Sequence, residues 1–202
     1  MGRRSDHSRQ ELRALILEQA HSHMAEVGFA RFSAREVAKR IGYSIGTIYN
    51  VYGTLDQLLA AVNTRTFEIW ADAIAAALES SGGDRIAAMV GGYFGFAREH
   101  RNLWNAIYDH HLPLGDVLDE EQALVRGRLT GIVGEEVAKA LPPARRGEAV
   151  AITRSLVAIV HGHCALDLGG AFALMGGTDA CGDALTRVRE VIAFGGTQLP
   201  GE

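Results

Sequence analysis

The chain has 202 residues, of which 48% are hydrophobic and 22% are charged, and its formal net charge is −4. This composition is ordinary for a globular protein that buries a core, and neither a repeat nor a low-complexity tract is visible. The longest uninterrupted apolar run is Ala73–Leu78, and the charged N-terminus lacks an apolar signal region. We therefore expect a cytoplasmic protein with no membrane partner.

The first predicted helix ends at Gly28. Apolar residues recur upstream of it at steps of three and four, which is typical of an amphipathic helix. They are Leu12, Leu15, Ile16, Ala20, Met24 and Val27.

Two short helices are predicted next, separated by a glycine turn. Ser33 is followed three residues later by Glu36, a capping box that predicts a helix from Ala34. Gly42 can adopt the left-handed conformation that ends this helix, and Ser44 can cap a second helix over Ile45–Val51. Two short helices joined in this way form a helix-turn-helix unit, whose second helix enters the DNA major groove. The pattern therefore predicts DNA binding.

The first helix and the helix-turn-helix unit together form the DNA reader. A long connecting helix follows it. Thr54 and Gln57 form another capping box, and apolar residues continue at helical spacing to Leu78. The clearest break in the chain is Ser80-Ser81-Gly82-Gly83.

The remainder also has helical patterns, and no strand pattern is present. Further helices are expected at about Asp84–Glu99, Asn102–His110, Val117–Ala140, Ala144–Leu168 and Asp179–Phe194. The predicted fold is therefore all-α, with an N-terminal three-helix helix-turn-helix domain linked by a long helix to a C-terminal helical bundle. We expect a DNA-binding domain at residues 1–55 and an effector-binding and dimerisation domain at 56–202, which includes the connecting helix at 54–79.

The reader resembles the TetR family of transcriptional regulators between about Arg9 and Val62. The matching residues are Phe32-Ser33, Val37-Ala38, Gly42-Tyr43-Ser44, Gly46-Thr47-Ile48-Tyr49, Asp56 and Leu58-Leu59. The family usually has His or Tyr where this chain has Val51, and Lys where it has Leu55. Both family residues tend to touch DNA phosphates, so we expect weaker binding here or contacts supplied from elsewhere.

Charge is distributed as a DNA reader requires. Residues 1–55 carry 8 Arg and Lys against 5 Asp and Glu, whereas residues 56–202 carry 12 against 19. Because phosphate neutralisation supplies the sequence-independent part of DNA affinity, positive charge is needed locally.

Residues of the two short helices are the predicted DNA contacts. Arg35 suits a bidentate contact to guanine, and the equivalent family position often reads a base or a phosphate. Hydroxyl groups suit phosphate oxygens, Ile45 suits a thymine methyl group and Asn50 suits adenine. Gly46 has no side chain to hold its backbone away from DNA. The predicted set is Ser33, Arg35, Ser44, Ile45, Gly46, Thr47, Tyr49 and Asn50.

The C-terminal half resembles one large TetR subgroup. Residues Tyr93 to His100, followed by Leu103-Trp104, are similar to the start of its effector domain, although Arg101 stands where the subgroup usually has Pro. The His161-Gly162 pair matches a segment that is Trp-rich in the subgroup, but the Trp is missing here.

Side chains in this half would suit a small, organic and largely apolar effector. The predicted ligand residues are Phe94, Trp104, Tyr108, His111, His161 and Cys164. The alternative is that these side chains only pack the core. We expect neither a metal nor another cofactor, because adjacent His110 and His111 point to different faces of a helix. Both cysteines are expected to be reduced and packed.

A homodimer follows from the size of the reader, because one short recognition helix reads few base pairs whereas two copies can meet a palindromic operator. Apolar residues on the last two long helices would form a four-helix interface. They are Val150, Leu156, Val157, Val160, Cys164, Leu168, Leu185, Val188, Ile192 and Phe194.

Together these features predict a repressor that a small-molecule ligand releases from double-stranded DNA at a palindromic operator. One alternative is a DNA-binding regulator without an effector. A less favoured one is an all-α enzyme, because the chain has no phosphate-binding glycine loop, no nucleophile elbow and no metal-ligand spacing. We therefore expect no enzymatic activity.

Overall fold

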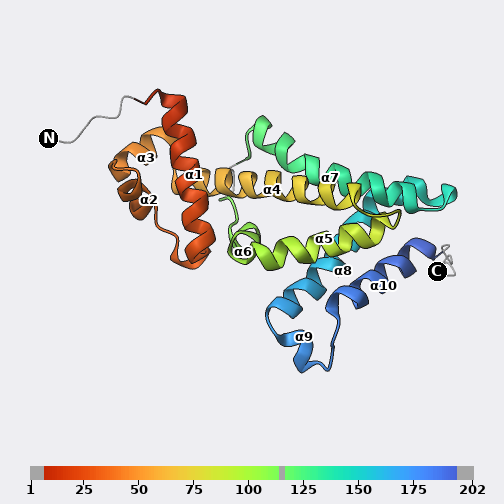
Figure 1. Ribbon diagram of the computed structural model, residues 1–202. Helices are drawn as coiled ribbons and strands as arrows, with labels where there is room; N and C mark the ends of the chain where they lie inside the picture. Colours follow the sequence, from red (N-terminus) through yellow and green to blue (C-terminus); the bar gives the residue numbers. More distant parts are fainter. Residues whose placement is uncertain (1–6, 114–116, 195–202) are drawn as a thin grey trace. The chain divides into compact units, whose positions relative to one another are not determined.

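The computed structural model describes residues 7–113 and 117–194, and this part of the chain consists of helices joined by turns and loops (Figure 1). The all-α prediction is confirmed. The α-helices are α1 (Arg9–Val27), α2 (Ala34–Arg40), α3 (Ile45–Tyr52), α4 (Leu55–Glu79), α5 (Arg85–Glu99), α6 (Arg101–Asp109), α7 (Glu120–Ala140), α8 (Ala149–Leu168), α9 (Ala171–Leu174) and α10 (Ala180–Ala193), with 3₁₀ segments η1 (Phe29–Arg31) and η2 (Pro143–Glu148).

The chain forms two compact units. Unit 1 comprises Met1–Ile69 and His100–Arg126, and unit 2 comprises Trp70–Glu99 and Gly127–Glu202. The long helices α4 and α7 each contribute residues to both units. These units follow packing, whereas the expected division at residues 55 and 56 is functional, so that division stays a prediction.

A single apolar core holds unit 1 together. Helices α1 to α4 supply most of it, and α6 adds Leu103 and Ala106. Each large aliphatic side chain that leaves water here stabilises the fold by about 1.5–3 kcal/mol. The large side chains that are fully buried in it are Ile16, Met24, Val37, Ile48, Leu58 and Val62.

Side-chain caps begin α2, α3 and α4 where the sequence predicts them. Ser44 Oγ accepts from Thr47 N at 3.2 Å, and Thr54 Oγ1 accepts from Gln57 N at 3.1 Å. At α2, Ser33 Oγ accepts from Glu36 N at 3.4 Å, which is one half of the predicted capping box. A complete capping box begins α1, where Ser8 and Glu11 exchange both bonds. The predictions did not include this last box.

Helices α5, α8 and α10 pack together in unit 2. Phe94 and Cys164 are among the fully buried residues between them. Trp70 stacks on Phe96, with ring centroids 4.9 Å apart. The Arg98 guanidinium joins α5 to α8 through a 2.8 Å ion pair with Asp167.

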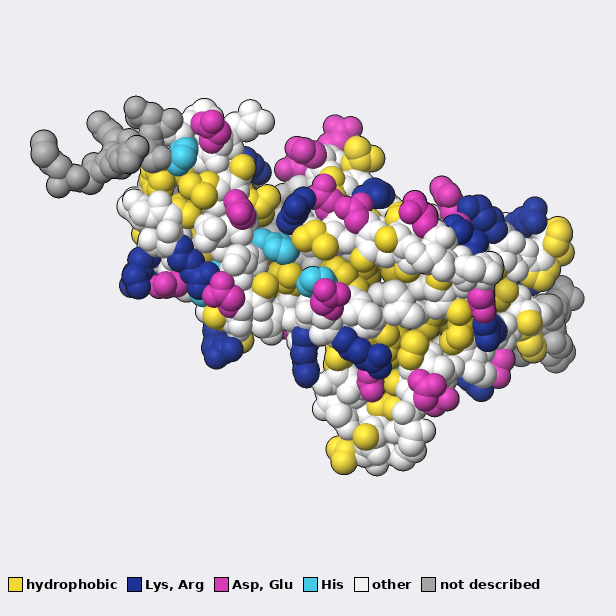
Figure 2. Space-filling view, in the orientation of Figure 1, with side chains coloured by type: hydrophobic (Ala, Val, Ile, Leu, Met, Phe, Trp, Pro, Cys, Tyr) yellow, Lys and Arg dark blue, Asp and Glu magenta, His cyan; other side chains and the backbone are white. Residues whose placement is uncertain are grey.

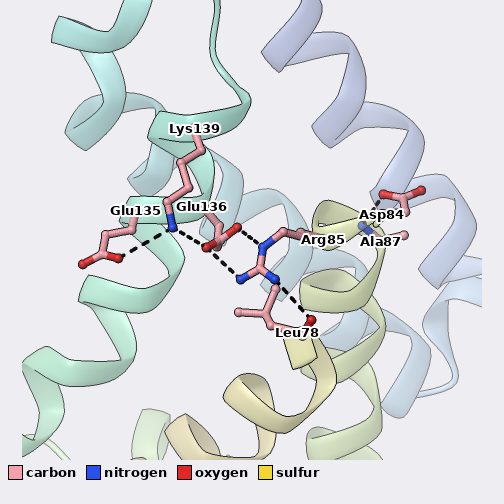
Figure 3. Close-up of polar contacts among 7 residues, drawn as sticks. All are labelled: Leu78, Asp84, Arg85, Ala87, Glu135, Glu136 and Lys139. Carbon is pink, nitrogen blue, oxygen red and sulfur yellow. Dashed lines mark hydrogen bonds and ion pairs between the residues drawn. The ribbon is translucent and has the colours of Figure 1, made fainter. Parts of the chain in front are cut away.

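A polar cluster joins α4, α5 and α7 within unit 2 (Figure 3). Arg85 donates to both carboxylate oxygens of Glu136, at 2.5 and 3.0 Å, and to the Leu78 carbonyl at 3.2 Å. Lys139 donates to Glu136 at 2.8 Å. Hydrogen bonds from these two cations hold the pKa of Glu136 at about 2. The nearly buried carboxylate is therefore charged and paired at neutral pH.

Two predicted boundaries in the C-terminal half are wrong, and one helix was not predicted. Helix α7 begins at Glu120 and not at Val117, because Asp119 accepts from Gln122 N and acts as its N-cap. The segment predicted to be helical from Ala144 begins as η2, and α-helix starts only at Ala149. The short helix α9 was not predicted.

Segment Pro143–Leu168, which joins η2 and α8, is long and apolar enough to cross a membrane by length and composition alone. Counting uninterrupted apolar runs did not single it out, because histidines and Arg154 interrupt it. Such a helix is by itself weak evidence for a membrane span, since the core helix of a soluble protein meets the same criteria. Only 28% of its most apolar window is buried, so α8 presents apolar surface outward.

Candidate nucleic-acid interface and ligand site

The turn between α2 and α3 has the geometry that its glycine suggests. Gly42 has φ +75°, the left-handed region that other residues rarely occupy. Gly42 N donates to Lys39 O at 3.2 Å and Tyr43 N donates to Ala38 O at 2.9 Å. These two bonds form a Schellman motif, which ends α2 and directs the chain into α3. The predicted helix-turn-helix is therefore present.

Helix α3 has one buried and one exposed side. Ile48 and Tyr52 lie in the core of unit 1, and Ile45 packs against its edge. Gly46 and Asn50 are exposed, as is Tyr49 with 40% of its surface accessible. Three of the predicted DNA contacts on α3 therefore face solvent, whereas Ile45 is partly occupied by packing.

Two residues that the predictions did not include hold the end of α3 on α1. The Tyr52 hydroxyl donates to Arg13 O at 2.9 Å, and the Arg13 guanidinium lies 4.4 Å from the centre of the Tyr52 ring. Burial raises the pKa of Tyr52, so its hydroxyl stays protonated and able to donate. Tyr52 follows Ile48 by one helical turn, and this spacing is the sequence signal that could have identified it.

The basic side chains of α2 differ in how they are paired. Arg40 makes bonds of 2.6 and 2.8 Å to the two carboxylate oxygens of Glu26, and these hydrogen bonds hold the pKa of Glu26 at about 2. Lys39 lies 3.6 Å from Glu36. Arg35 is exposed, and its side chain makes no hydrogen bond or ion pair with any residue in the described ranges. Lys and Arg side chains gather over α2 in Figure 2.

Hydroxyl groups predicted to contact phosphates already serve as caps. Ser44 Oγ lies 3.1 Å from Thr47 Oγ1 in addition to its bond with Thr47 N. Ser33 caps α2 and is half-buried. A hydroxyl group that caps a helix can still donate its proton, so these phosphate contacts stay predictions.

The predicted ligand residues fall in both units. In unit 1, Trp104 is buried and packs on Tyr108 with ring centroids 5.1 Å apart, while His111 is exposed. In unit 2, Phe94 and Cys164 are buried in the core, and burial raises the pKa of Cys164 to about 12.

His161 lies in unit 2 with a partner that the predictions did not include. Its Nδ1 is 3.0 Å from the hydroxyl of Tyr93, and burial lowers the pKa of the imidazole. A role for any of these residues in ligand binding stays a prediction.

Comparisons with known proteins match most of the chain. A family model described as bacterial regulatory proteins, tetR family, matches residues 16–62, and one described as tetracyclin repressor-like, C-terminal domain, matches residues 86–188. No curated protein matches the chain.

Several solved structures share the fold. A protein of unknown function from Rhodococcus sp. RHA1 is 23% identical with a TM-score of 0.71, over 95% of this chain and 97% of that one. The multidrug binding protein EbrR, complexed with imidazole, is 22% identical with a TM-score of 0.62, over 96% and 99%. A TetR-like transcriptional regulator from Rhodococcus sp. RHA1 is 20% identical with a TM-score of 0.55, over 92% and 96%.

Proposed function

Because the chain belongs to the TetR family of bacterial regulatory proteins, we propose that it is a sequence-specific, DNA-binding transcriptional regulator of the cytoplasm. The observation that carries this proposal is the exposed side of the α2–α3 unit. Arg35, Tyr49 and Asn50 face solvent there, while the opposite side of the same helices is buried in a packed core. A rigid helix with exposed polar groups can enter a major groove without unfolding.

The regulator acts as a homodimer on a palindromic operator. Support comes from α8 and the residue that follows α10, where exposed apolar side chains remain after unit 2 has folded. Val150 has 72% of its surface exposed, Val157 39% and Phe194 60%. Leu156, Val160 and Val188, which the sequence placed in the same set, are buried in unit 2 and serve its own core. A two-fold interface would cover the exposed apolar surface.

A small organic ligand releases the repressor from DNA. Support comes from EbrR, a protein of similar fold that is a multidrug binding protein and carries imidazole. Within unit 2 the proposed ligand residues are Phe94, His161 and Cys164, and within unit 1 they are Trp104, Tyr108 and His111. Cavities that bind such ligands are mostly apolar and have a few polar groups. In unit 2 the Tyr93–His161 pair supplies polar groups of this kind.

Helix α6 is the element through which a ligand would affect the reader. It follows α5 directly in the chain, yet it belongs to unit 1. Asn102 Nδ2 donates to Ala25 O in α1 at 2.7 Å, and Asn63 Nδ2 in α4 donates to Ala106 O at 3.1 Å. A ligand that displaces α6 would therefore pull on α1 and α4. Couplings of about 1–3 kcal/mol are typical of such linkage.

Selection from a random DNA library with the full chain tests the proposal. We expect a palindromic consensus, and gel-shift titration should give tighter binding to it than to a scrambled duplex of the same composition. Equal affinity for both duplexes at low salt would exclude sequence-specific regulation.

A regulator without a small-molecule effector is the second candidate. It is favoured by the burial of Phe94 and Cys164, since side chains packed in a core have no surface left for a ligand. A ligand screen by thermal unfolding separates the two candidates. A compound that raises the melting temperature and weakens operator binding supports release by a ligand.

A further inference from the structure

A cleft of about 620 Å³ lies within unit 1, beside the recognition helix. Its walls come from the start of α1, the end of α3, the start of α4 and the start of α7. This volume is in the range of small-molecule sites. None of the predicted ligand residues lines it.

The cleft is positively charged. Arg9 and Arg13 line it from successive turns of α1, so they share one face of that helix. Arg13 is held against the Tyr52 ring, and its Nη1 donates only to a carbonyl, that of Val51 at 3.4 Å. Neither arginine makes an ion pair within residues 7–113 and 117–194.

Acidic groups offset only part of this charge. Asp119 is the one carboxylate among the described lining residues, and its Oδ1 already accepts from Gln122 N at 2.8 Å to cap α7. Its negative charge offsets one of the two arginines, so the described lining residues keep a formal charge of +1, and the arginine N–H groups can still donate to an added anion.

A third arginine adds positive potential at the wall. Arg126 Nη2 donates to the carbonyl of Ala60, a lining residue, at 2.7 Å, and its Nε donates to Thr64 Oγ1 at 2.9 Å. Both acceptors are neutral, and burial lowers the pKa of Arg126. A partly buried guanidinium that has only neutral partners favours a nearby anion.

Apolar side chains complete the cleft. Val51, Leu112 and Val117 line it together with the Tyr52 ring. We infer that this cleft binds a small organic acid, whose carboxylate pairs with Arg9 and Arg13 and whose apolar body packs on these side chains. The site lies in the DNA-binding unit and shares Asn50 with the predicted DNA contacts, whereas none of the effector residues proposed for α5, α6 and α8 lines it.

Calorimetric titration of the full chain with 1-naphthoate, without DNA, tests this site. The neutral isostere 1-naphthamide keeps the rings and removes the charge. We expect naphthoate to bind at least about tenfold more tightly than the amide, because charge-assisted bonds to arginine are lost with the carboxylate.

Three variants locate the binding. Arg9→Gln and Arg13→Gln should each weaken naphthoate binding about tenfold. Arg35→Gln removes the same charge outside the cleft and should leave it unchanged. Arg13 also packs on Tyr52, so Arg9→Gln, whose side chain has no bond in the described ranges, tests the site even where Arg13→Gln fails to fold.

The outcomes separate this site from the regulator proposal. Equal binding of the acid and the amide, the absence of naphthoate binding, or unchanged affinity in Arg9→Gln would overturn the cleft assignment. None of these results bears on operator binding. Loss of operator binding in Arg35→Gln with unchanged naphthoate affinity would show that the two sites are distinct.

Discussion

Arginines in the same helix have different roles in this protein, and the partner of each side chain decides its role. Arg40 is neutralised by a bidentate pair with Glu26, whereas Arg35, one turn and a half earlier, is exposed without a partner in the described ranges. An arginine bound to a carboxylate must break that pair before it can bind a phosphate. Arg35 is therefore the stronger candidate for DNA contact.

Arg35→Ala should weaken operator binding by about 1–3 kcal/mol, which is roughly 5- to 150-fold in Kd, because a bidentate base contact is lost. Arg146→Ala removes the same charge from an exposed position in unit 2 and should leave Kd unchanged. Fluorescence anisotropy with a labelled operator measures both. Affinity and selectivity equal to those of the parent would disprove the role of Arg35.

His21 should make the stability of unit 1 sensitive to mild acid. Burial, Arg65 and His100 lower its pKa to about 4, and its Nε2 lies 3.3 Å from Thr66 Oγ1. The folded state therefore favours the neutral imidazole. Below the usual pKa of about 6.5 the unfolded chain binds the proton more readily, so the unfolding free energy falls as pH drops from 6.5 to 4.

Urea unfolding followed by circular dichroism across this pH window checks the expectation. His21→Gln should flatten the decline, and His111→Gln, at an exposed histidine, should keep it. A decline of the same slope in His21→Gln would show that another group is responsible.

At the scale of elements, local backbone geometry and hydrogen bonds between nearby residues decide where the helices of the reader begin and end. Gly42 supplies the left-handed residue of the Schellman motif, and Ser44 caps the following helix. Elsewhere, elements are joined by pairs distant in sequence, such as Arg85 and Glu136. Substitutions at these two kinds of position should therefore change the unfolding free energy in different ways.

Gly42→Ala should lower the unfolding free energy by about 1–2 kcal/mol, because a Cβ is disfavoured at positive φ. Space is not the cause, since an added Cβ at Gly42 meets nothing within 4 Å. Gly131→Ala is the matched control in the interior of α7, where the same change should stabilise by about 0.5–1 kcal/mol. Chemical denaturation measures both, and effects of equal sign would contradict the backbone argument.

Glu136→Gln should lower the unfolding free energy at pH 7 by about 1–3 kcal/mol, because Arg85 and Lys139 lose a charged acceptor. The lowered pKa means that this stabilisation is present above about pH 4.5 and is lost as pH falls towards 2. The difference between parent and variant should therefore shrink through that window. Glu135→Gln changes an exposed carboxylate 3.9 Å from Lys139 and should cost less than about 0.5 kcal/mol.

At the scale of the whole molecule, the proposed repressor function requires two copies of the helix-turn-helix domain, and the exposed apolar side chains of α8 are the proposed contact between them. The sequence pattern marks both faces of α8 as apolar. Packing in unit 2 uses Leu156, Val160 and Cys164, which leaves Val150 and Val157 for a second copy. Hydrophobic side chains also remain exposed at the end of α9 in Leu174 and Met175 (Figure 2).

Val157→Glu should convert a dimer into a monomer in analytical ultracentrifugation and lower operator affinity, because a buried unpaired charge is costly at an interface. Leu124→Glu, at a side chain 76% exposed on α7, should leave the dimer intact. A Val157→Glu protein that remains dimeric would place the interface elsewhere.

The sequence alone determined the longer helices and the class of the fold, but not the short helix α9 or the starts of α7 and α8. Helix starts at Ala34, Ile45 and Leu55 follow from side chains that bond to the backbone three residues away, and Gly42 ends α2 through its own φ. Such interactions are local, so they can be read from adjacent residues. The buried sides of α1 to α4 follow from periodicity for the same reason.

Tertiary structure decided which side chains remain available for binding DNA or a ligand. The Arg40–Glu26 pair, the Tyr52–Arg13 contact and the position of α6 in unit 1 depend on residues 14, 39 and 77 places apart. The cleft beside α3 likewise joins α1 to the start of α7. No local pattern encodes such pairings, because they arise only when the helices pack. The chain's periodicity thus specifies helices and cores, while packing specifies which arginines are free to meet an anion.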